Sequence, residues 1–284
     1  MTHPADRPAT WFVTGASRGL GLALVAHLLR DSQRVAATTR SADRLLTALD
    51  GLGDVDTSGL LALEVQLTDE QSVRQAVDRA RSTFGDLDVV VNNAGYGFLG
   101  AVEETSDADV QGLLDVQVRG TWNVIRAALP GMREAGSGHI INISSILGMV
   151  TFPGWALYCA GKFALEGLSE ALAAEVADLG IRVTVVEPGY FDTDFLTGES
   201  ITLPTRTTDA YPGIREMTAH HLAMPGSQIG DPAKAAAALV EITRQDGPLR
   251  QQLGSDAYRF ALAKVDALAG EVAAGRDLAH TTDY

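Results

Sequence analysis

An apolar run that leads through a glycine-rich turn into a helical repeat constrains the fold of this chain more than any other feature. The run covers residues 10–13, and the turn reads Thr-Gly-Ala-Ser-Arg-Gly-Leu-Gly over residues 14–21. This order predicts a dinucleotide site, because glycines let backbone amides and a helix N-terminus approach a pyrophosphate. The alternative is a turn that glycine only eases, since the spacing differs from the Gly-x-Gly-x-x-Gly fingerprint. The residues that we assign to the cofactor here are Gly15, Ser17, Arg18, Gly19, Leu20 and Gly21.

Apolar strands alternate with helical segments along the rest of the chain. We expect further strands at residues 34–38, 60–65, 87–91, 140–144, 181–186 and 249–253. We expect helices at residues 69–84, 107–133, 155–179, 232–242 and 257–274. This rhythm predicts an α/β fold with a parallel, doubly wound sheet. At 284 residues and 46% hydrophobic, the chain can bury one substantial core, so we expect a single domain over residues 1–284.

The segment between Gly189 and Gly230 lacks this alternation. Apolar residues such as Phe195 and Met217 are scattered there among polar ones. A long irregular segment inside a compact domain is usually a lid or a binding loop, so we predict an irregular substrate loop at about residues 190–230. Residues 255–284 are expected to form a C-terminal helix and a polar tail.

The charge balance and the cysteine count limit the classes of partner. The 36 acidic and 22 basic residues give a net charge of −14, which repels nucleic-acid phosphates and anionic lipid. We therefore expect neither nucleic acid nor a membrane as a partner. The single cysteine, Cys159, cannot form an internal disulfide, and residues 1–7 lack the apolar core of a signal peptide. These features predict a cytoplasmic protein that binds a small molecule.

The residues after the second expected strand predict which dinucleotide binds. A dehydrogenase specific for NAD would carry an acid there to hold the ribose hydroxyls, whereas this chain has Thr39 and then Arg40. The guanidinium groups of Arg40 and Arg18 would suit the 2′-phosphate of NADP through bidentate hydrogen bonds. Each arginine could instead be a solvated surface charge. We predict NADP(H) as the cofactor and no metal.

A hydroxyl, a phenol and an ammonium are spaced so that one carbonyl group could meet all three. Tyr158 and Lys162 are four residues apart and therefore share one face of the expected helix. A tyrosine ordinarily ionises near pH ~10, and we expect the neighbouring ammonium to lower the pKa of Tyr158 so that it can transfer a proton. Ser145 follows the strand at 140–144, where the strand end and the helix would converge. Alone, a Tyr-x-x-x-Lys pair could also arise by chance.

A turn of small residues follows the buried strand at 87–91. It reads Asn92-Asn93-Ala94-Gly95, and such a turn lets the backbone lie against a flat ring. It could also be only a turn. We assign Asn93, Ala94 and Gly95 to the cofactor.

These motifs resemble those of the short-chain dehydrogenase/reductase family, from about residue 10 to residue 253. The shared residues, in the family's order and at its spacings, are Thr14, Gly15, Gly19, Gly21, Asn92 to Gly95, Ser145, Tyr158, Lys162, Pro188 and Gly189. The resemblance implies a Rossmann fold and hydride transfer with NAD(P). It implies that Tyr158 is the acid/base, that Lys162 holds the nicotinamide ribose and tunes Tyr158, and that Ser145 orients the substrate carbonyl. It also implies that Thr193, which follows Pro188-Gly189, contacts the nicotinamide carboxamide.

Two positions depart from the family pattern. Gln66, beside Leu67, stands where an aspartate is common near the adenine, and its neutral amide can still hydrogen-bond an adenine amino group. Gln117 stands where the family has a catalytic asparagine, which keeps a local distortion in the long helix so that a main-chain carbonyl can hold a water bonded to the lysine. A glutamine adds one methylene and prefers a regular helix, so we expect a working but slowed proton relay.

The combined motifs predict an NADPH-dependent reductase of aldehydes or ketones that also runs in reverse as an alcohol dehydrogenase. Tyr96, Phe98, Phe152 and Trp155 flank the catalytic motifs and predict an apolar pocket, unless they are ordinary core residues. The resemblance also implies a homodimer or homotetramer that forms through the helices at 107–133 and 155–179.

Two other functions remain open at this point. Gln117 supports a dinucleotide-binding regulator in which catalysis has lapsed, although a regulator has no need of Ser145, Tyr158 and Lys162. A nucleotide-sugar epimerase or dehydratase also uses a Tyr-x-x-x-Lys pair. The part of the chain after residue 230 is too short for the sugar domain of such an enzyme.

Overall fold

Seven parallel strands form the central sheet, in the order β3-β2-β1-β4-β6-β7-β9. They are β1 (Thr10–Val13), β2 (Arg34–Thr39), β3 (Leu60–Glu64), β4 (Val89–Asn92), β6 (Gly138–Ile143), β7 (Ile181–Pro188) and β9 (Arg250–Leu253). The computed structural model describes residues 7–284, so most of the segment on which the signal-peptide prediction rests, residues 1–6, lies outside the described residues. The strand order reverses between β1 and β4, and such a reversal opens a crevice at the carboxyl ends of the strands.

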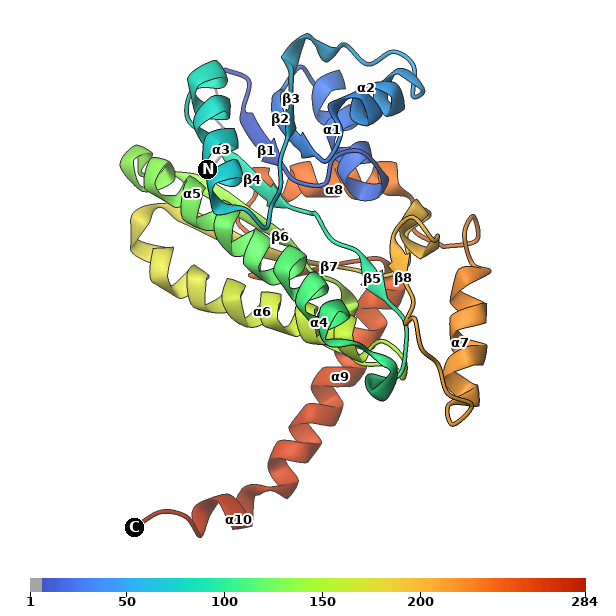
Figure 1. Ribbon diagram of the computed structural model, residues 1–284. Coiled ribbons are helices and arrows are strands. Elements are labelled where there is room, and N and C mark those ends of the chain that lie inside the picture. The colour runs from blue at the N-terminus through green and yellow to red at the C-terminus, as the bar shows by residue number, and fades with distance from the viewer. Residues whose placement is uncertain (1–6) are drawn as a thin grey trace.

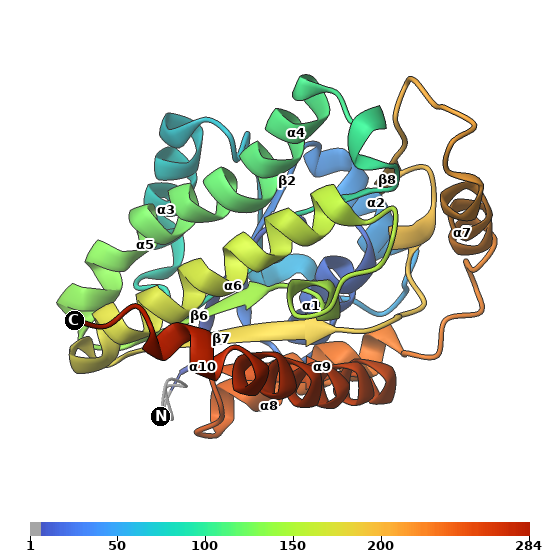
Figure 2. The same cartoon turned by 90° about the horizontal axis from the view of Figure 1, so that it is seen from below.

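Helices cover both faces of the sheet (Figures 1 and 2). One face is covered by α1 (Gly19–Arg30), α2 (Ala42–Asp50) and α8 (Pro232–Arg244). The other face is covered by α3 (Glu70–Phe84), α5 (Thr121–Ala135) and α6 (Ala156–Val176). The predicted doubly wound, parallel sheet is therefore confirmed.

Alternate residues of each inner strand face the two helix layers. In β1, Trp11 and Val13 pack in the core beneath α1 and α8, while Phe12 packs in the core beneath α3 and α5. All three side chains are fully buried. Because both faces of the strand are covered, it is a continuous apolar run in the sequence rather than an alternating one.

The expected long helix at residues 107–133 is interrupted by a wider turn. It consists of α4 (Asp107–Leu114), a π-helical turn (Asp115–Gly120) and α5, which follow one another directly. Such turns are rare and occur mostly within α-helices at functional sites. The interruption lies around Gln117, where we expected the glutamine to work against a distortion.

The segment at 190–230 contains more regular structure than predicted. A short 3₁₀ helix (Asp194–Leu196), the two-residue strand β8 (Ile201–Thr202) and the helix α7 (Pro212–Leu222) all lie in it. β8 pairs with β5 (Gly97–Phe98). The prediction of an irregular loop is therefore wrong in part, because β8 is too short to show a pattern and α7 packs Met217 against Trp155 and Leu196 rather than on the sheet.

Four further 3₁₀ helices connect the main elements. They are Thr57–Gly59, Val102–Glu104, Ile146–Gly148 and Ala177–Leu179. The chain ends in α9 (Ser255–Ala274) and α10 (Arg276–His280), which extend away from the sheet (Figure 1).

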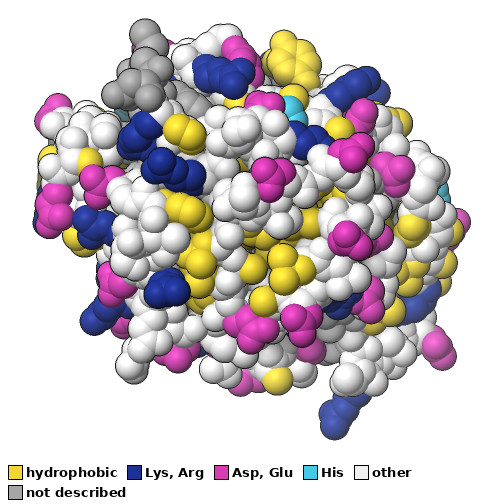
Figure 3. Space-filling view, turned by 90° about the horizontal axis from the view of Figure 1, so that it is seen from above, with side chains coloured by type: hydrophobic (Ala, Val, Ile, Leu, Met, Phe, Trp, Pro, Cys, Tyr) yellow, Lys and Arg dark blue, Asp and Glu magenta, His cyan; other side chains and the backbone are white. Residues whose placement is uncertain are grey.

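The surface carries charges of both signs. On the face in Figure 3, Lys and Arg side chains are interspersed with Asp and Glu rather than gathered in a single basic patch. None of the helices within residues 7–284 combines the length and the apolar character that crossing a membrane requires.

Candidate active site

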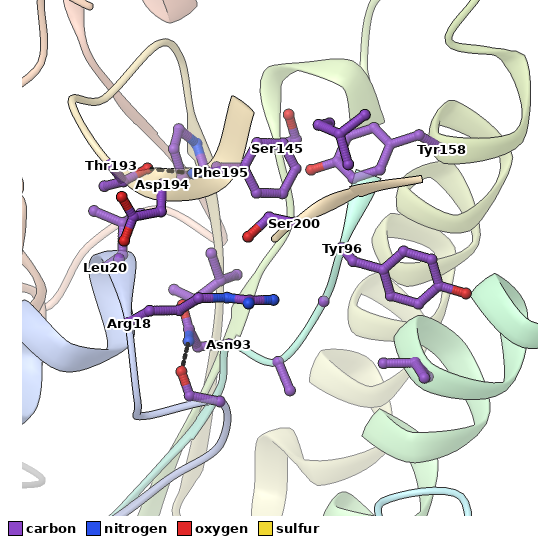
Figure 4. A pocket seen from close by; sticks show the side chains of 18 of the residues that line it. Arg18, Leu20, Asn93, Tyr96, Ser145, Tyr158, Thr193, Asp194, Phe195 and Ser200 are labelled. Atoms are coloured by element: carbon purple, nitrogen blue, oxygen red, sulfur yellow. Dashed lines mark hydrogen bonds between the residues drawn. The ribbon is translucent and has the colours of Figure 1, made fainter. Parts of the chain in front are cut away.

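A cavity of about 580 Å³ lies at the carboxyl ends of β1, β2, β4 and β6. Figure 4 shows Arg18 and Leu20 on one side of it and Tyr96 and Tyr158 on the other. The predicted site residues that line it are Gly15, Ser17, Arg18, Gly19, Leu20, Arg40, Gln66, Leu67, Asn93, Ala94, Gly95, Ser145, Tyr158, Lys162, Pro188, Gly189 and Thr193. Two predicted residues, Gly21 and Gln117, are not among those that line the cavity.

The glycine turn is joined tightly to the end of β4. Thr14 Oγ1 accepts hydrogen bonds from the backbone amides of Asn93 (2.9 Å) and Ala94 (3.1 Å). Asn93 Nδ2 donates to the carbonyl oxygens of Thr14 (3.0 Å) and Gly15 (3.1 Å). A Cβ on Gly15, whose φ is +68°, would lie 2.7 Å from Ala94 Cα, so this position requires glycine.

Gly21 acts inside this joint rather than at the cavity wall. A Cβ there would lie 2.4 Å from the carbonyl oxygen of Gly15 and 2.5 Å from Asn93 Nδ2. The assignment of Gly21 to cofactor binding remains a prediction, while its contacts show that glycine here lets α1 lie close to Gly15 and Asn93.

The first turn of α1 fits a pyrophosphate. Arg18 is the N-cap of this helix, and its side chain makes no capping hydrogen bond. The first amides of a helix have no partner within the helix and carry partial positive charge, so they attract an anion. With Gly19 at a φ of +55°, the turn leaves the backbone open to a dinucleotide phosphate.

Ser145, Tyr158 and Lys162 meet at the other end of the cavity. Ser145 follows β6, and its Oγ accepts a hydrogen bond from the amide of Leu147 at 3.1 Å. Lys162 Nζ donates to the carbonyl oxygen of Ile143 at 2.8 Å and lies 5.6 Å from the centre of the Tyr158 ring. The predicted convergence of the β6 end with the helix α6 is therefore confirmed as geometry.

Burial controls the pKa of both ionisable side chains. Burial raises the pKa of Tyr158 well above its ordinary value, and a hydrogen bond with Ser145 opposes part of the increase. Burial lowers the pKa of Lys162 to about 8, although the nearby carboxylate of Glu166 raises it. The expectation that Lys162 lowers the pKa of Tyr158 is wrong for the chain itself, because the desolvation of a fully buried phenol dominates. Tyr158 is therefore a protonated acid at neutral pH.

Gln117 is accommodated by a glycine on the neighbouring helix. Its Nε2 donates to the carbonyl oxygen of Tyr96 at 2.7 Å, and its side chain is buried. A Cβ on Gly161 would lie only 2.6 Å from Gln117 Oε1, so the absence of a side chain at Gly161 makes room for the longer amide. The π-helical turn is present with glutamine, so the helix preference of this residue does not remove the distortion. The slowed proton relay stays a prediction.

Arg18 and Arg40 line the end of the cavity that the adenosine would reach, and a third arginine, Arg44, lies near Arg18. Arg18 and Arg40 were predicted, and Arg44, in the first turn of α2, was missed. Burial lowers the pKa of Arg18, and so do the positive charges of Arg40 and Arg44, which places the three groups close together. The sequence did contain a signal for Arg44, because this second arginine follows Arg40 by only four residues.

One carboxylate contacts two of these arginines. Arg44 Nη2 donates to Glu199 Oε2 at 2.8 Å, and Arg18 Nη1 lies 3.8 Å from the same oxygen. Glu199 comes from the segment before β8, 155 residues from Arg44. A sequence pattern cannot reveal a contact between segments so far apart.

The turn after β7 is fixed by a second missed residue, Asp256. Its Oδ2 accepts a hydrogen bond from the amide of Tyr190 at 2.9 Å. A Cβ on Gly189 would lie 2.3 Å from the same oxygen, so Gly189 is needed for this contact. The turn continues to Thr193, which lies across from the glycine turn, since a Cβ on Gly19 would be 3.7 Å from Thr193 Cβ.

Aromatic side chains surround the Tyr158 ring. The ring centre of Tyr158 lies 5.4 Å from that of Trp155 and 5.7 Å from that of Phe195. Tyr96 and Phe152 also line the cavity, as predicted, whereas Phe98 packs beneath it against Leu113. The cavity is therefore mostly apolar near Tyr158, and the inclusion of Phe98 was wrong because β5 turns that side chain inward.

Comparison with known proteins shows a family and several close relatives. A family model described as short chain dehydrogenase matches residues 9–202. The oxidoreductase BOA17 of Botryotinia fuckeliana is 34% identical over 94% of this chain and 97% of its own length. The 3-ketodihydrosphingosine reductase of Bacteroides thetaiotaomicron is 35% identical over 87% of this chain and 88% of its own length. A short-chain dehydrogenase structure from Streptomyces avermitilis is 35% identical, with a TM-score of 0.87 over 99% of this chain and 100% of that one.

Similar folds occur with both dinucleotides bound. ElxO with NADP bound is 25% identical, with a TM-score of 0.72 over 87% of this chain and 97% of that one. A short chain dehydrogenase/reductase from Burkholderia phymatum in complex with NAD is 18% identical, with a TM-score of 0.80 over 95% of both chains. The comparisons support a nicotinamide cofactor and do not choose between the two forms.

Proposed function

Because this chain belongs to the short chain dehydrogenase family and is an oxidoreductase, we propose that it interconverts a bulky, apolar carbonyl compound and its alcohol with NADP(H). The observation that carries the proposal is that one cavity is lined by Arg18 and Arg40 at one end and by Ser145 and Tyr158 at the other.

The preference for NADP(H) rests on charge at the adenosine end. Thr39 and Arg40 follow β2, where an acid would repel a 2′-phosphate. Arg18 and Arg44 supply further guanidinium groups nearby, and planar guanidinium donors suit phosphate oxygens. Because the three positive charges repel one another, the binding of a phosphate among them is electrostatically favourable.

The apolar substrate is inferred from the lining near Tyr158. Trp155 and Phe195 flank the phenol, and Phe152 and Leu196 extend the same wall. Such a wall favours a substrate that buries much apolar surface. The name of the relative from Bacteroides thetaiotaomicron, a 3-ketodihydrosphingosine reductase, agrees with a ketone that carries a long apolar chain.

The chain's own residues handle the proton and the orientation of the substrate. In carbonyl reduction, the Tyr158 hydroxyl donates its proton to the carbonyl oxygen. Ser145 Oγ accepts from the Leu147 amide, which fixes the hydroxyl beside Tyr158, and its proton can turn from the phenol oxygen to the carbonyl oxygen of a substrate. Lys162 spends one N–H on the Ile143 carbonyl oxygen and stabilises the phenolate that forms. The nicotinamide supplies or accepts the hydride when it is bound.

A catalytically lapsed regulator is no longer favoured by any specific observation. The argument for it was Gln117, and the helix keeps its π-helical turn with that residue. Ser145, Tyr158 and Lys162 also lie together at the cavity.

We further propose that the protein is a cytoplasmic homodimer or homotetramer. The helices α5 and α6 lie side by side on one outer face (Figures 1 and 2). Trp122 on α5 and Phe163 on α6 are 52% and 42% exposed, which suits burial against a second copy.

The test is a panel of ketones, aldehydes and alcohols of increasing apolar size, assayed with NADP(H) and NAD(H). We expect kcat/KM with NADPH to exceed that with NADH by at least ~10-fold, since contacts to the 2′-phosphate are charge-assisted. We also expect kcat/KM to rise with the apolar size of the substrate.

Tyr158→Phe should lose at least ~100-fold in kcat with little change in NADPH affinity, because only the transferable proton is removed. Equal use of both cofactors would contradict the NADP preference, and a turnover that survives in Tyr158→Phe would assign the acid to another group.

A further inference from the structure

Glu199 lies where an anion bound to the arginine group would lie. Its Oε2 is 2.8 Å from Arg44 Nη2 and 3.8 Å from Arg18 Nη1, and its charge also acts on Arg40. Glu199, Arg18 and Arg40 line the same cavity. A carboxylate and a phosphate use the same guanidinium N–H donors, so a 2′-phosphate and Glu199 would compete for them.

The ion pair between Glu199 and Arg44 is exposed, so an anion such as a phosphate can replace the carboxylate at little cost to the stability of the fold. The side chain of Glu199 is 61% exposed and that of Arg44 is 54% exposed. Exposed pairs of this kind contribute little to stability, because water and salt screen them. Asp194 also acts on Arg18, but the direct contacts of the group with a carboxylate run through Glu199 within the described residues.

The backbone beside Glu199 leads directly to the wall of the substrate end. The amides of Ser200 and Ile201 both donate to the Thr197 carbonyl oxygen at 2.9 Å. Ile201 begins β8, which pairs with Gly97 of β5, and Gly97 follows Tyr96 in the cavity lining. Glu199 is therefore two residues from β8, both residues of which line the cavity.

We propose that Glu199 is a specificity residue that competes with the 2′-phosphate of NADP for Arg18 and Arg44, and that phosphate binding releases its segment from the arginine group. The proposal rests on the NADP(H) preference proposed above. NAD, with a hydroxyl in place of the phosphate, leaves the ion pair intact. The competition therefore moderates the preference for NADP and makes the 197–202 segment respond to the form of the cofactor.

The binding experiment compares Glu199→Gln with the wild-type protein by titration calorimetry with NADP+ and NAD+ at low ionic strength. We expect the Kd for NADP+ to fall about twofold to fivefold, the range that an exposed ion pair gives, while the Kd for NAD+ does not fall. Glu216→Gln is the matched control, because Glu216 lies exposed on α7 of the same segment and the change in charge is identical. Its Kd values should match those of the wild type.

A second readout follows the segment itself. Hydrogen exchange of the amides at 199–201 should become faster when NADP+ saturates the wild-type protein and should not when NAD+ does. In Glu199→Gln these amides should exchange alike with both cofactors.

The outcomes separate this proposal from the cofactor preference. A wild-type protein that prefers NADP+ and a Glu199→Gln variant with an unchanged or weaker Kd for NADP+ would overturn the competition alone. A wild type without preference whose Glu199→Gln variant favours NADP+ would support the competition. No preference in either protein would overturn both.

Discussion

Gln117 and Gly161 form a matched pair of residues on two helices that meet at the active site. The glutamine amide reaches the Tyr96 carbonyl oxygen because Gly161 carries no Cβ in its path. The family pattern has an asparagine at position 117, and this chain has the longer glutamine. Gly161 on the neighbouring helix leaves the space that the longer side chain occupies. A substitution in one helix is accommodated by a small residue in the other.

This pair makes a prediction at the scale of single residues. Gly161→Ala would place a Cβ 2.6 Å from Gln117 Oε1 and 2.9 Å from Leu113 Cδ2, so the glutamine amide must move and its bond to Tyr96 is strained. We expect this variant to lose stability and kcat. In a Gln117→Asn background the shorter side chain withdraws, so the same change should cost less.

A double-mutant cycle measures the coupling. Urea unfolding of the four proteins should give an interaction free energy of about 1 kcal/mol between the two positions. Gly167→Ala, on the outer face of the same helix with open space around its Cβ, controls for the higher helix preference of alanine. Additive effects of Gly161→Ala and Gln117→Asn would show that the two residues are independent.

At the scale of elements, the sequence predicted the sheet far better than the cavity wall. The expected strand at 181–186 is β7 (Ile181–Pro188), and the expected helix at 232–242 is α8 (Pro232–Arg244). β7 is a nearly continuous buried run of eight residues, and α8 is a helix of 13 residues with one buried face. Each is therefore long enough to show a clear apolar pattern in the sequence. β5 and β8 have two residues each, which is too short for any period.

The parts of the site that were missed depend on contacts between distant segments. The turn residues and the Tyr158, Lys162 and Ser145 group follow from local motifs. The ion pair of Arg44 with Glu199 joins positions 155 apart, and the bond of Asp256 to the Tyr190 amide joins positions 66 apart. The apolar pattern of residues 107–133 did not show the π-helical turn at Asp115–Gly120, and only the resemblance to the family pointed to a distortion at position 117.

The helix α7 gives a prediction at this scale. Arg215 of α7 forms an ion pair with Glu104, whose carboxylate also accepts from the amides of Thr208 (2.8 Å) and Ala101 (3.0 Å). Glu104→Gln keeps the size of the side chain but removes the charge that holds α7. We expect KM for the apolar substrate to rise about threefold to tenfold and proteolysis near residues 203–211 to accelerate, as for loops that border a site.

Glu103→Gln is the matched control for this variant. Glu103 accepts a hydrogen bond from the Tyr211 hydroxyl at the exposed edge of the same segment. Its loss should have a smaller effect on both measurements. An unchanged KM and an unchanged rate of proteolysis in Glu104→Gln would show that other contacts hold α7.

At the scale of the whole molecule, a buried histidine predicts how stability depends on pH. His139 lies in β6, where burial and the charge of Arg182 lower its pKa to about 3. In the unfolded chain a histidine has a pKa near ~6.5. The pKa of His139 is therefore lower in the folded protein than in the unfolded chain. The contribution of neutral His139 to the free energy of unfolding is present in full above the unfolded pKa and is lost as pH falls toward 3.

The expected size can be checked by unfolding in urea. Between about pH 6 and pH 4 this group should lower the free energy of unfolding by about 1 kcal/mol per pH unit, because the unfolded state binds one more proton. His139→Gln should make the pH dependence shallower, even if it lowers stability at pH 7. His280→Gln, in the exposed C-terminal helix, should leave the slope unchanged. A slope that His139→Gln does not alter would assign the acid sensitivity to other groups.

The thiol of Cys159 can be used to measure motions of the start of α6, the segment that carries Tyr158. The thiol is the only one in the chain, is 4% exposed, and has a pKa that burial raises, so a thiol reagent can reach it only when the start of α6 opens. The rate of its modification under native conditions therefore measures how often the segment beside Tyr158 separates from its surroundings. A dinucleotide or substrate that closes the cavity should slow this labelling, which would provide a binding assay that requires neither turnover nor an introduced label.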